Sequence, residues 1–367
     1  MSNLAQISAL TATQSQLPVS WYFDPHIAEA EKTLLFNAGP RYIGHELMVP
    51  NHGDYHVLDG LYDSKSLVHN DNGVELISNV CRHRQSLLLK GRGHAQNIVC
   101  PLHRWTYALD GKLLGAPQFP DTPCLDLPKT ALQRWNGMLF DGPRTVAQDL
   151  AKLGVMNEFD FSGYLFDRVV VEDYAFNWKT FIEVYLEDYH VVPYHPGLGS
   201  FVDASNLKWD FGEWYSLQVV GVNQKLAKPG TATYEKWHQA VLKYRNGAEP
   251  PHGAIWFTYY PNIMVEWYPH VLVISTVHPR GPEACTNVVE FYYPEDIVLF
   301  EREFVEAEQQ AYHETAVEDE EICRLMTQGR QALYRAGEND GGPYQSPMED
   351  GMQHFHEFLQ RQLAGHI

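Results

Sequence analysis

Positive charge, long apolar runs and cysteine are all scarce in this chain of 367 residues. Lys and Arg together number 27 against 46 Asp and Glu, which gives a formal net charge of −19 at pH 7. Nucleic-acid binding depends on clustered Lys and Arg, and no basic run is present, so we expect no nucleic-acid partner. Apolar stretches such as 271–274 are far shorter than the about 20 residues that cross a bilayer, so we expect no membrane span.

Targeting and redox signals are equally few. The start of the sequence lacks the charged and apolar regions of a secretory signal, which predicts a cytoplasmic protein. Five cysteines, an odd number, suit a reducing compartment better than a disulfide framework. The hydrophobic content of 44% is ordinary for a globular protein, and the length allows two domains with separate cores.

The pattern of strands and turns changes along the chain. Residues 41–145 contain short β-rich runs broken by Gly, Asn and Asp, which predicts an all-β domain of short strands and hairpins. Residues 146–367 combine apolar strands with a long helical stretch at 295–336, which predicts an α+β domain. The strands expected to form its antiparallel sheet include 255–260, 263–268, 271–277 and 286–293.

Two short motifs, Cys81-x-His83 and Cys100-x-x-His103, each combine a thiol with an imidazole. A Rieske [2Fe–2S] cluster requires this mixture, because two Cys hold one iron and two His hold the other, which raises the reduction potential. A zinc site uses the same donors but usually pairs Cys with Cys and His with His. Chance is a further alternative in a chain with 18 His. The flanking residues favour the cluster, because 99–105 resembles a cluster loop of the Rieske family.

The sequence departs from Rieske oxygenases at two positions. Gln85 and Arg104 stand where members of that family usually carry glycine, which lets the backbone turn tightly. The ligand residues are unchanged, so we expect the replacements to act on hydrogen bonding around the cluster and thus on its potential.

His190 and His195 are candidate ligands of a second, mononuclear iron. Non-haem Fe(II) oxygenases use two His and one carboxylate, which leaves open positions for O₂ and substrate. One regular helix would place residues five apart on different faces, so we expect Pro193, followed by Pro196, to interrupt it. The alternative is a pair of ordinary His at a helix end.

The run 318–321 offers four carboxylates for the third ligand. Asp319 shares the apolar stripe of the predicted helix with Cys323, whereas Glu321 shares a face with Glu318. A carboxylate on an apolar stripe is costly unless a metal or a partner compensates its charge. Asp319 is therefore the predicted ligand, and an acidic run on a solvated face is the alternative that suits Glu320 and Glu321.

Glu187 and Asp188 are the predicted catalytic carboxylates beside this site. Glu187 precedes His190 by one helical turn, from where it can reach the second nitrogen of the ring. Asp188 is the rival, with the poorer geometry.

Together these motifs resemble the catalytic α subunit of Rieske non-haem iron oxygenases over nearly the whole chain. The resemblance implies an all-β Rieske domain and a helix-grip catalytic domain, in which an antiparallel sheet holds a long C-terminal helix, with residues 1–40 packing on the latter. It implies a [2Fe–2S] cluster and a mononuclear Fe(II) in each chain. It also implies a homotrimer, in which Glu187 bridges electron transfer between subunits, and an NAD(P)H-dependent reductase with flavin and [2Fe–2S]. The form Glu187-x-Tyr-His190 resembles members that act on carnitine-like and choline-like compounds.

The substrate is less well indicated. Aromatic residues at 256–260 and 267–268 lie on strands that should line the catalytic cavity, where rings can hold a quaternary ammonium, stack on an aromatic substrate or fill the core. We expect O₂-dependent hydroxylation or demethylation of a small molecule, with a quaternary ammonium or N-methyl compound favoured. Ring hydroxylation of an aromatic acid is the alternative, and a Rieske electron-transfer protein without oxygenase activity is the alternative of another class.

Overall fold

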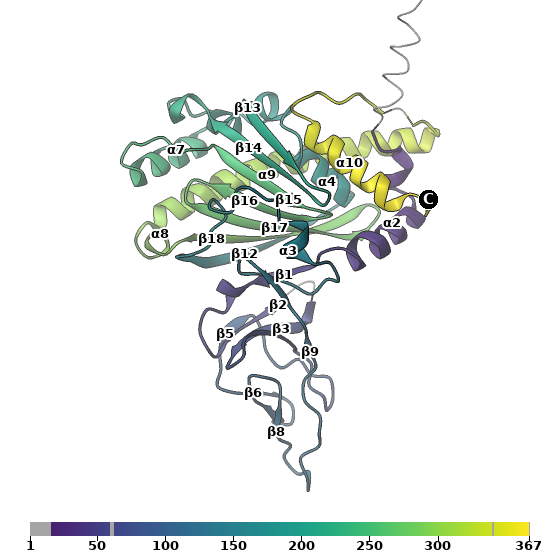
Figure 1. The fold of residues 1–367 in the computed structure, drawn as a ribbon, viewed down its shortest axis with the longest axis vertical. Coiled ribbons are helices and arrows are strands. Elements are labelled where there is room, and N and C mark those ends of the chain that lie inside the picture. The colour runs from purple at the N-terminus through teal and green to yellow at the C-terminus, as the bar shows by residue number, and fades with distance from the viewer. Residues whose placement is uncertain (1–15, 59–61, 340, 367) are drawn as a thin grey trace, which may run out of the picture. The chain divides into compact units, whose positions relative to one another are not determined.

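The computed structural model describes residues 16–58, 62–339 and 341–366. The chain forms two compact units (Figure 1), one of residues 40–147 and one of residues 148–367 with the segment that ends at Gly39. The predicted N-terminal segment 1–40 thus lies partly outside the described residues. No helix in the described part of the chain is both long and apolar enough to span a membrane.

The unit of residues 40–147 consists of short antiparallel strands, in agreement with the prediction of an all-β domain. One sheet has the order β1–β11–β10, a second β5–β2–β3–β4–β9 and a third β6–β7–β8. The bounds are β1 Tyr42–His45, β2 Asp54–Leu58, β3 Tyr62–Asn70, β4 Gly73–Ser78, β5 Arg92–His94, β6 Ile98–Val99, β7 Thr106–Tyr107, β8 Leu113–Gly115, β9 Lys129–Thr130, β10 Gln133–Trp135 and β11 Met138–Phe140, with a short helix η3 at Glu46–Met48. Trp105 and Tyr107 are the largest side chains of its core, which also contains Cys81 and Cys100.

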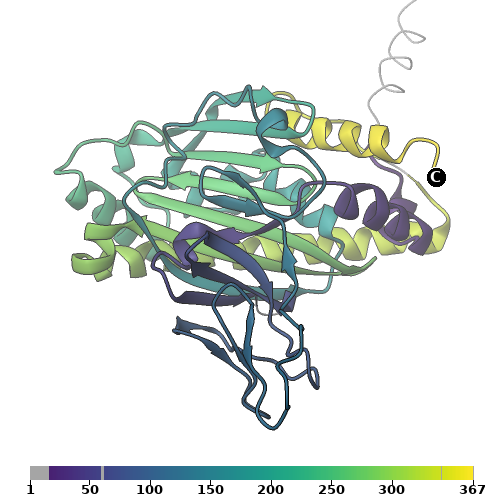
Figure 2. The same cartoon turned by 60° about the horizontal axis from the view of Figure 1, so that its bottom comes forward.

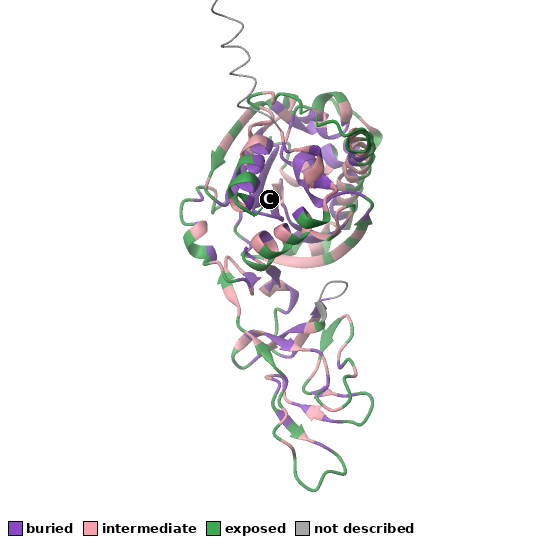
Figure 3. Cartoon of the chain, turned by 90° about the vertical axis from the view of Figure 1, so that its right-hand side faces the viewer, coloured by how far each residue is buried: buried purple, intermediate pink, exposed green. Residues whose placement is uncertain are grey.

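The larger unit is built on a seven-stranded antiparallel sheet with the order β12–β18–β17–β16–β15–β14–β13. Its strands are β12 Tyr164–Tyr174, β13 Val202–Phe211, β14 Tyr215–Val222, β15 Ala254–Tyr259, β16 Ile263–Tyr268, β17 Val271–Gly281 and β18 Ala284–Pro294. β-branched and aromatic residues dominate the central strands, as strand propensity favours. Every residue of β15 is buried, so both faces of the sheet are covered there. Figure 3 shows the buried residues inside this unit and the exposed ones at its periphery.

A 35-residue helix, α9 (Arg302–Ala336), packs against this sheet (Figures 1 and 2). The Tyr312 hydroxyl on α9 donates to Glu266 on β16 at 3.1 Å, and the Tyr293 hydroxyl on β18 donates to Glu308 on α9 at 2.5 Å. Gly337 ends the helix in the left-handed conformation that glycine adopts readily. The predicted helical stretch 295–336 is in fact two helices, because Glu301 leaves the helical conformation between α8 (Glu295–Phe300) and α9.

Shorter helices complete the fold and place the site. They are η1 Val19–Tyr22, α2 Pro25–Glu31, η2 Lys32–Asn37, α3 Val146–Asp149, α4 Trp178–Tyr185, α5 Val191–Tyr194, α6 Leu198–Phe201, η4 Gln224–Leu226, α7 Ala232–Tyr244 and α10 Asp350–Leu363. The Asn177 side chain caps α4 by accepting the Lys179 backbone N–H at 2.9 Å.

Buried charges tie α4 to its neighbours. Glu183 on α4 lies 2.6 Å from Arg330 of α9 and 2.9 Å from His356 of α10, and it also accepts the Tyr22 hydroxyl. Because Glu183 is completely buried, this pairing compensates a charge that would otherwise be very costly. The arrangement fixes α4, from which the chain continues directly into the candidate site.

Candidate active site

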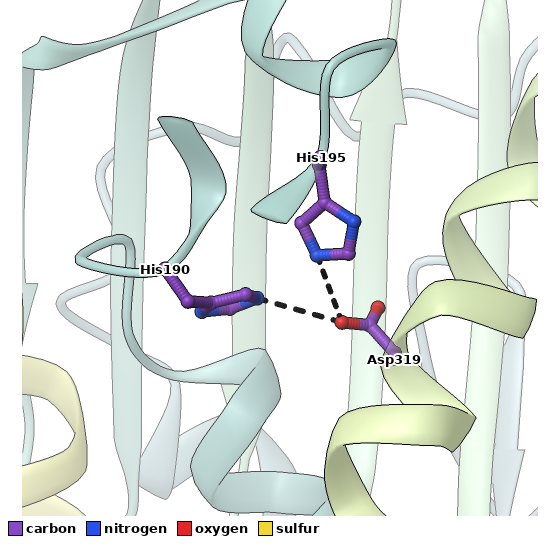
Figure 4. Close-up of side chains that lie close together, drawn as sticks. All are labelled: His190, His195 and Asp319. Carbon is purple, nitrogen blue, oxygen red and sulfur yellow. Dashed lines mark hydrogen bonds and ion pairs between the residues drawn. The ribbon is translucent and has the colours of Figure 1, made fainter. Parts of the chain in front are cut away.

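His190, His195 and Asp319 meet in the larger unit (Figure 4). One oxygen of Asp319 lies 3.0 Å from His195 Nε2 and 3.4 Å from His190 Nε2. Among the described residues, these three form the one group of His, Cys, Asp or Glu whose potential ligand atoms all lie within 4.8 Å of one another. Two imidazoles and a carboxylate converging on one point are the donor set that a mononuclear Fe(II) site requires.

The chain brings the two histidines together by a route that differs from the prediction. Pro193 does not interrupt the helix, because it lies within the single turn α5 that runs from Val191 to Tyr194. Proline is tolerated in a first turn, where its missing N–H would have no partner. His190 precedes α5 in helical conformation and His195 ends it with φ −107° and ψ 84°, so the break is at His195 itself.

The outer nitrogens of both rings face further carboxylates. His190 Nδ1 lies 2.5 Å from Glu187, as predicted, although a turn rather than a helix delivers Glu187 to the ring. His195 Nδ1 lies 2.7 Å from Glu318, an interaction that the sequence did not reveal. A carboxylate on the outer nitrogen holds the proton there and turns the other nitrogen toward a metal. The helix pattern had grouped Glu318 with a solvated face. The signal was that a metal-binding histidine needs a hydrogen-bond partner on its second nitrogen, and Glu318 adjoins the predicted ligand Asp319.

The electrostatics of the site favour a bound cation. Burial opposes a charged imidazole, but Asp319 and Glu187 outweigh it and raise the pKa of His190 to about 10. Burial likewise opposes an ionised Asp319, yet the two histidines hold the pKa of that carboxyl below its usual value. Three carboxylates thus surround two imidazoles, an excess of negative charge that suits a divalent metal ion.

Asp188 occupies a different position from its neighbour Glu187. It is buried, and its carboxylate accepts a hydrogen bond from the Gln218 side chain rather than from either histidine. Burial and the nearby Glu187 raise the pKa of Asp188 to about 7. Its backbone N–H donates to Met348 at 3.0 Å, so Asp188 also connects the site to the segment before α10.

A cavity of about 290 Å³ opens beside the three residues. Its acidic lining residues are Glu172, Glu187, Asp188, Glu266, Glu308 and Asp319. Arg168 is the one arginine in the described lining, which includes no lysine, and it is paired with Asp167 at 2.9 Å. The cavity lining is therefore rich in carboxyl groups and poor in cationic side chains.

Two of these carboxyls, Glu266 and Glu308, escaped the sequence analysis. Burial raises the pKa of Glu266 to about 7 and that of Glu308 to about 8. The signal for Glu266 was present, because it is the one charged residue within the apolar run Ile263–Tyr268.

The predicted aromatic lining is only partly correct. Trp256 and Tyr268 line the cavity. Phe257 does not and packs on Phe159, because successive residues of a strand point to opposite faces. Tyr260 lies just past the end of β15 and packs on Phe358. Phe257 and Tyr260 therefore fill the core, which was one of the expected roles of these rings.

The four predicted cluster ligands lie on two loops of similar geometry in the smaller unit. In each loop the Cys backbone N–H donates to the carbonyl five residues on, Cys81 to Ser86 at 2.9 Å and Cys100 to Trp105 at 2.8 Å. The residue before each of these acceptors, Gln85 or Arg104, has a φ of 53° or 61°. These are the positions where glycine is usual in the family, so the loops keep the left-handed turn without glycine.

The donors of these loops suit a cluster better than a single ion. The imidazoles of His83 and His103 face one another, with ring centroids 4.7 Å apart, and Cys81 and Cys100 are both buried. His83 Nδ1 is buried and has no hydrogen-bond partner, as expected for a ligand atom. The four residues do not form a group that closes on one ion, as zinc would require, whereas a [2Fe–2S] cluster separates its Cys and His ligands on two irons.

Comparison with protein families gives the same assignment for both units. Residues 37–127 match the Rieske [2Fe–2S] domain, and residues 161–365 match the ring hydroxylating alpha subunit (catalytic domain). Among solved structures, the quaternary ammonium Rieske monooxygenase CntA with inhibitor MMV12 has a TM-score of 0.76 at 18% identity, with 95% of each chain covered. Naphthalene 1,2-dioxygenase from Rhodococcus sp. has a TM-score of 0.70 at 19% identity, with 95% of each chain covered, so the fold is shared.

Relatives with higher sequence identity extend over the whole chain. Putrescine 2-hydroxylase of Ralstonia nicotianae is 63% identical over 361 residues, which are 98% of this chain and 99% of the relative. Putrescine 2-hydroxylase of Bordetella bronchiseptica is 53% identical over 99% of this chain and 88% of its own length. Chloroplastic choline monooxygenase of Amaranthus tricolor is 27% identical over 94% of this chain and 77% of its own length. With its two metal-binding units, the chain therefore belongs to the Rieske non-haem iron oxygenases, enzymes that carry a [2Fe–2S] cluster and a mononuclear iron.

Proposed function

We propose that this oxygenase hydroxylates a small aliphatic diamine, with putrescine as the first candidate. The acidic cavity carries the proposal, because Glu172, Glu266 and Glu308 add to the carboxylates already at the metal site. Buried carboxylates are costly without compensating charge, and a diamine that is protonated at both ends would supply it. A substrate with its own carboxylate would be repelled, which argues against the alternative of an aromatic acid.

The relatives support the same substrate class. Those at 63% and 53% identity are both putrescine 2-hydroxylases, whereas the choline monooxygenases share about half that identity. This favours a primary amine over the quaternary ammonium compound that the sequence first suggested.

We assign roles to the site residues on the basis of their geometry. His190, His195 and Asp319 would hold the iron, and a bound Fe(II) supplies O₂ activation at its open positions. Glu318 orients the His195 ring and holds a proton at its Nδ1, and the Glu187 carboxylate lies against Nδ1 of His190 at 2.5 Å. In the overall reaction a substrate C–H bond becomes C–OH, the second oxygen atom leaves as water, and NAD(P)H supplies the electron pair.

The smaller unit, residues 40–147, would deliver electrons to the mononuclear site. We propose a [2Fe–2S] cluster at Cys81, His83, Cys100 and His103, reduced by a separate reductase with flavin and [2Fe–2S]. His103 and the apolar Leu102 beside it are exposed, and so are the apolar Tyr189 and Val192 on either side of His190. Exposed apolar side chains next to both sites support a homotrimer in which the cluster of one subunit docks near His190 of the next.

The test is a measurement of metal content followed by turnover. We expect about three irons and two acid-labile sulfides per chain. With a surrogate reductase, NADH and ¹⁸O₂, putrescine should gain one labelled oxygen atom. A fully loaded enzyme that oxidises choline or an aromatic acid but no diamine would contradict the proposal. Two irons and two sulfides after iron reconstitution would instead indicate an electron-transfer protein.

A further inference from the structure

We propose that Glu266 is the receptor for one terminal ammonium of the substrate, held within a box of tyrosine hydroxyls and aromatic rings. This inference rests on the proposed function and names the residue that gives the cavity its substrate class. Glu266 projects from β16 into the same cavity as the metal-site residues, and only 2% of its surface is exposed.

The hydrogen bonds of Glu266 come from neutral groups. Its Oε2 accepts the Tyr268 hydroxyl at 2.9 Å and its Oε1 accepts the Tyr312 hydroxyl at 3.1 Å. The Trp256 ring N–H in turn donates to the Tyr268 oxygen at 3.0 Å, which fixes that tyrosine as a donor to Glu266. Among the described groups that act on Glu266, none is cationic.

This arrangement is unfavourable until a cation arrives. A carboxylate has about four acceptor sites, and the two tyrosines use only two of them. Glu308 is also buried and lines the same cavity, and Glu266 contributes to the raised pKa of its carboxyl. An ammonium group would supply both the missing charge and the missing donors, and such charge-assisted hydrogen bonds are the strong ones.

The aromatic rings around Glu266 also favour a cationic substrate. The ring centroids of Tyr268 and Tyr312 lie 6.5 Å apart with their planes at 88°, and Trp256 lies 6.4 Å from Tyr268. The faces of such rings attract a cation. The Tyr185 hydroxyl also lines the cavity and is buried without a hydrogen-bond partner, so it is available to the substrate. Rings alone would suffice for a quaternary ammonium, which donates no hydrogen bond. A central carboxylate with tyrosine hydroxyls matches a primary ammonium.

The position of the receptor suits a short chain. Tyr312 and Asp319 are on the same helix, about two turns apart, which corresponds to roughly 10 Å along the axis. A substrate anchored at Glu266 can therefore extend toward the metal site, and its other ammonium lies among the remaining carboxylates.

The inference is tested by titrating putrescine into the iron-loaded enzyme and its variants by calorimetry, with steady-state kinetics in parallel. Glu266→Gln keeps the shape but removes the charge, and we expect it to weaken putrescine binding by about ten- to hundredfold. The value of KM should rise in parallel, while kcat at saturation changes little. Glu266→Asp keeps the charge and should lose distinctly less putrescine affinity than Glu266→Gln. The matched control is Glu290→Gln on β18, because Glu290 is also buried and accepts the hydroxyl of a tyrosine two residues on, Tyr292, but is not among the described lining residues of the cavity. It should stay within about threefold of the wild type.

Each outcome decides between the two proposals. If the wild type binds and hydroxylates putrescine but Glu266→Gln loses no more putrescine affinity than Glu290→Gln, the receptor is refuted and the proposed function stands. Equal losses of putrescine affinity in Glu266→Gln and Glu266→Asp would also refute the receptor, because the charge of residue 266 would then not contribute to binding. A wild type that neither binds nor oxidises any diamine would refute both proposals.

Discussion

Replacing Glu318 with alanine should weaken iron binding at the mononuclear site without touching a ligand. Glu318 lies 2.7 Å from His195 Nδ1, while Nε2 of the same ring lies 3.0 Å from Asp319. Without Glu318 the ring loses the hydrogen bond that fixes its orientation and raises its basicity. Loss of such a partner typically costs 10- to 100-fold in metal affinity, or about 1.4–2.8 kcal/mol.

The assay is iron retention during dialysis against a graded series of chelator concentrations. The visible absorption of the [2Fe–2S] cluster serves as an internal control, because Cys81 and His83 lie in the other unit. Glu320→Ala is the matched variant, since Glu320 is on the same helix but is half-exposed and lies 3.7 Å from Arg324. If Glu318→Ala retained iron as tightly as Glu320→Ala, the orienting role of Glu318 would be wrong. Glu318→Gln should be intermediate, because its amide oxygen can still accept from Nδ1.

Three further predictions follow from other contacts. Glu187→Gln should keep both metal centres but lower turnover severalfold, because it removes the charge 2.5 Å from His190; near-normal coupled turnover would exclude the bridging role. Glu183→Ala should lower the free energy of unfolding by about 3–5 kcal/mol, measured by denaturant titration, because it removes the carboxylate that pairs with the largely buried Arg330 and the buried His356. Burial raises the pKa of Glu266 to about 7, so its charge is present above pH 7 and is lost below it. The KM for putrescine should therefore rise about tenfold per pH unit below 7 in the wild type. This rise should be distinctly smaller in Glu266→Gln, because Asp188 and Glu308 are then the remaining described carboxyls of the cavity with a pKa raised to about 7 and about 8.

Local motifs explain what could be predicted from the sequence. The Cys and His pairs, and the pair His190 and His195, lie close together along the chain, so residue type and spacing were enough to propose them. Asp319 could be proposed as a ligand although it lies far along the chain, because helix periodicity separates a buried face from a solvated one. The central strands were recognised because short apolar runs follow one another with only short turns between them.

Interactions between distant segments explain what was missed. Glu318 and Asp319 are neighbours on α9, and assigning the first to solvent ignored that a long side chain at the edge of the stripe can still reach His195. The break at Glu301 has no proline or glycine to announce it. Glu266 depends on Tyr312 from α9, a contact that no local pattern contains.

The helix α9 supplies both a metal-site residue and a donor to the proposed ammonium receptor. A single helix does not bend at a hinge between Tyr312 and Asp319, so the separation of the two positions is constant. The helix therefore sets a fixed distance between the proposed ammonium receptor and the metal site. A diamine one methylene longer that anchors at Glu266 would present the same carbon to the iron, counted from the anchored ammonium, and its extra methylene would lie beyond the iron. Chain length would then change the position of the new hydroxyl relative to the free ammonium before it abolished the reaction.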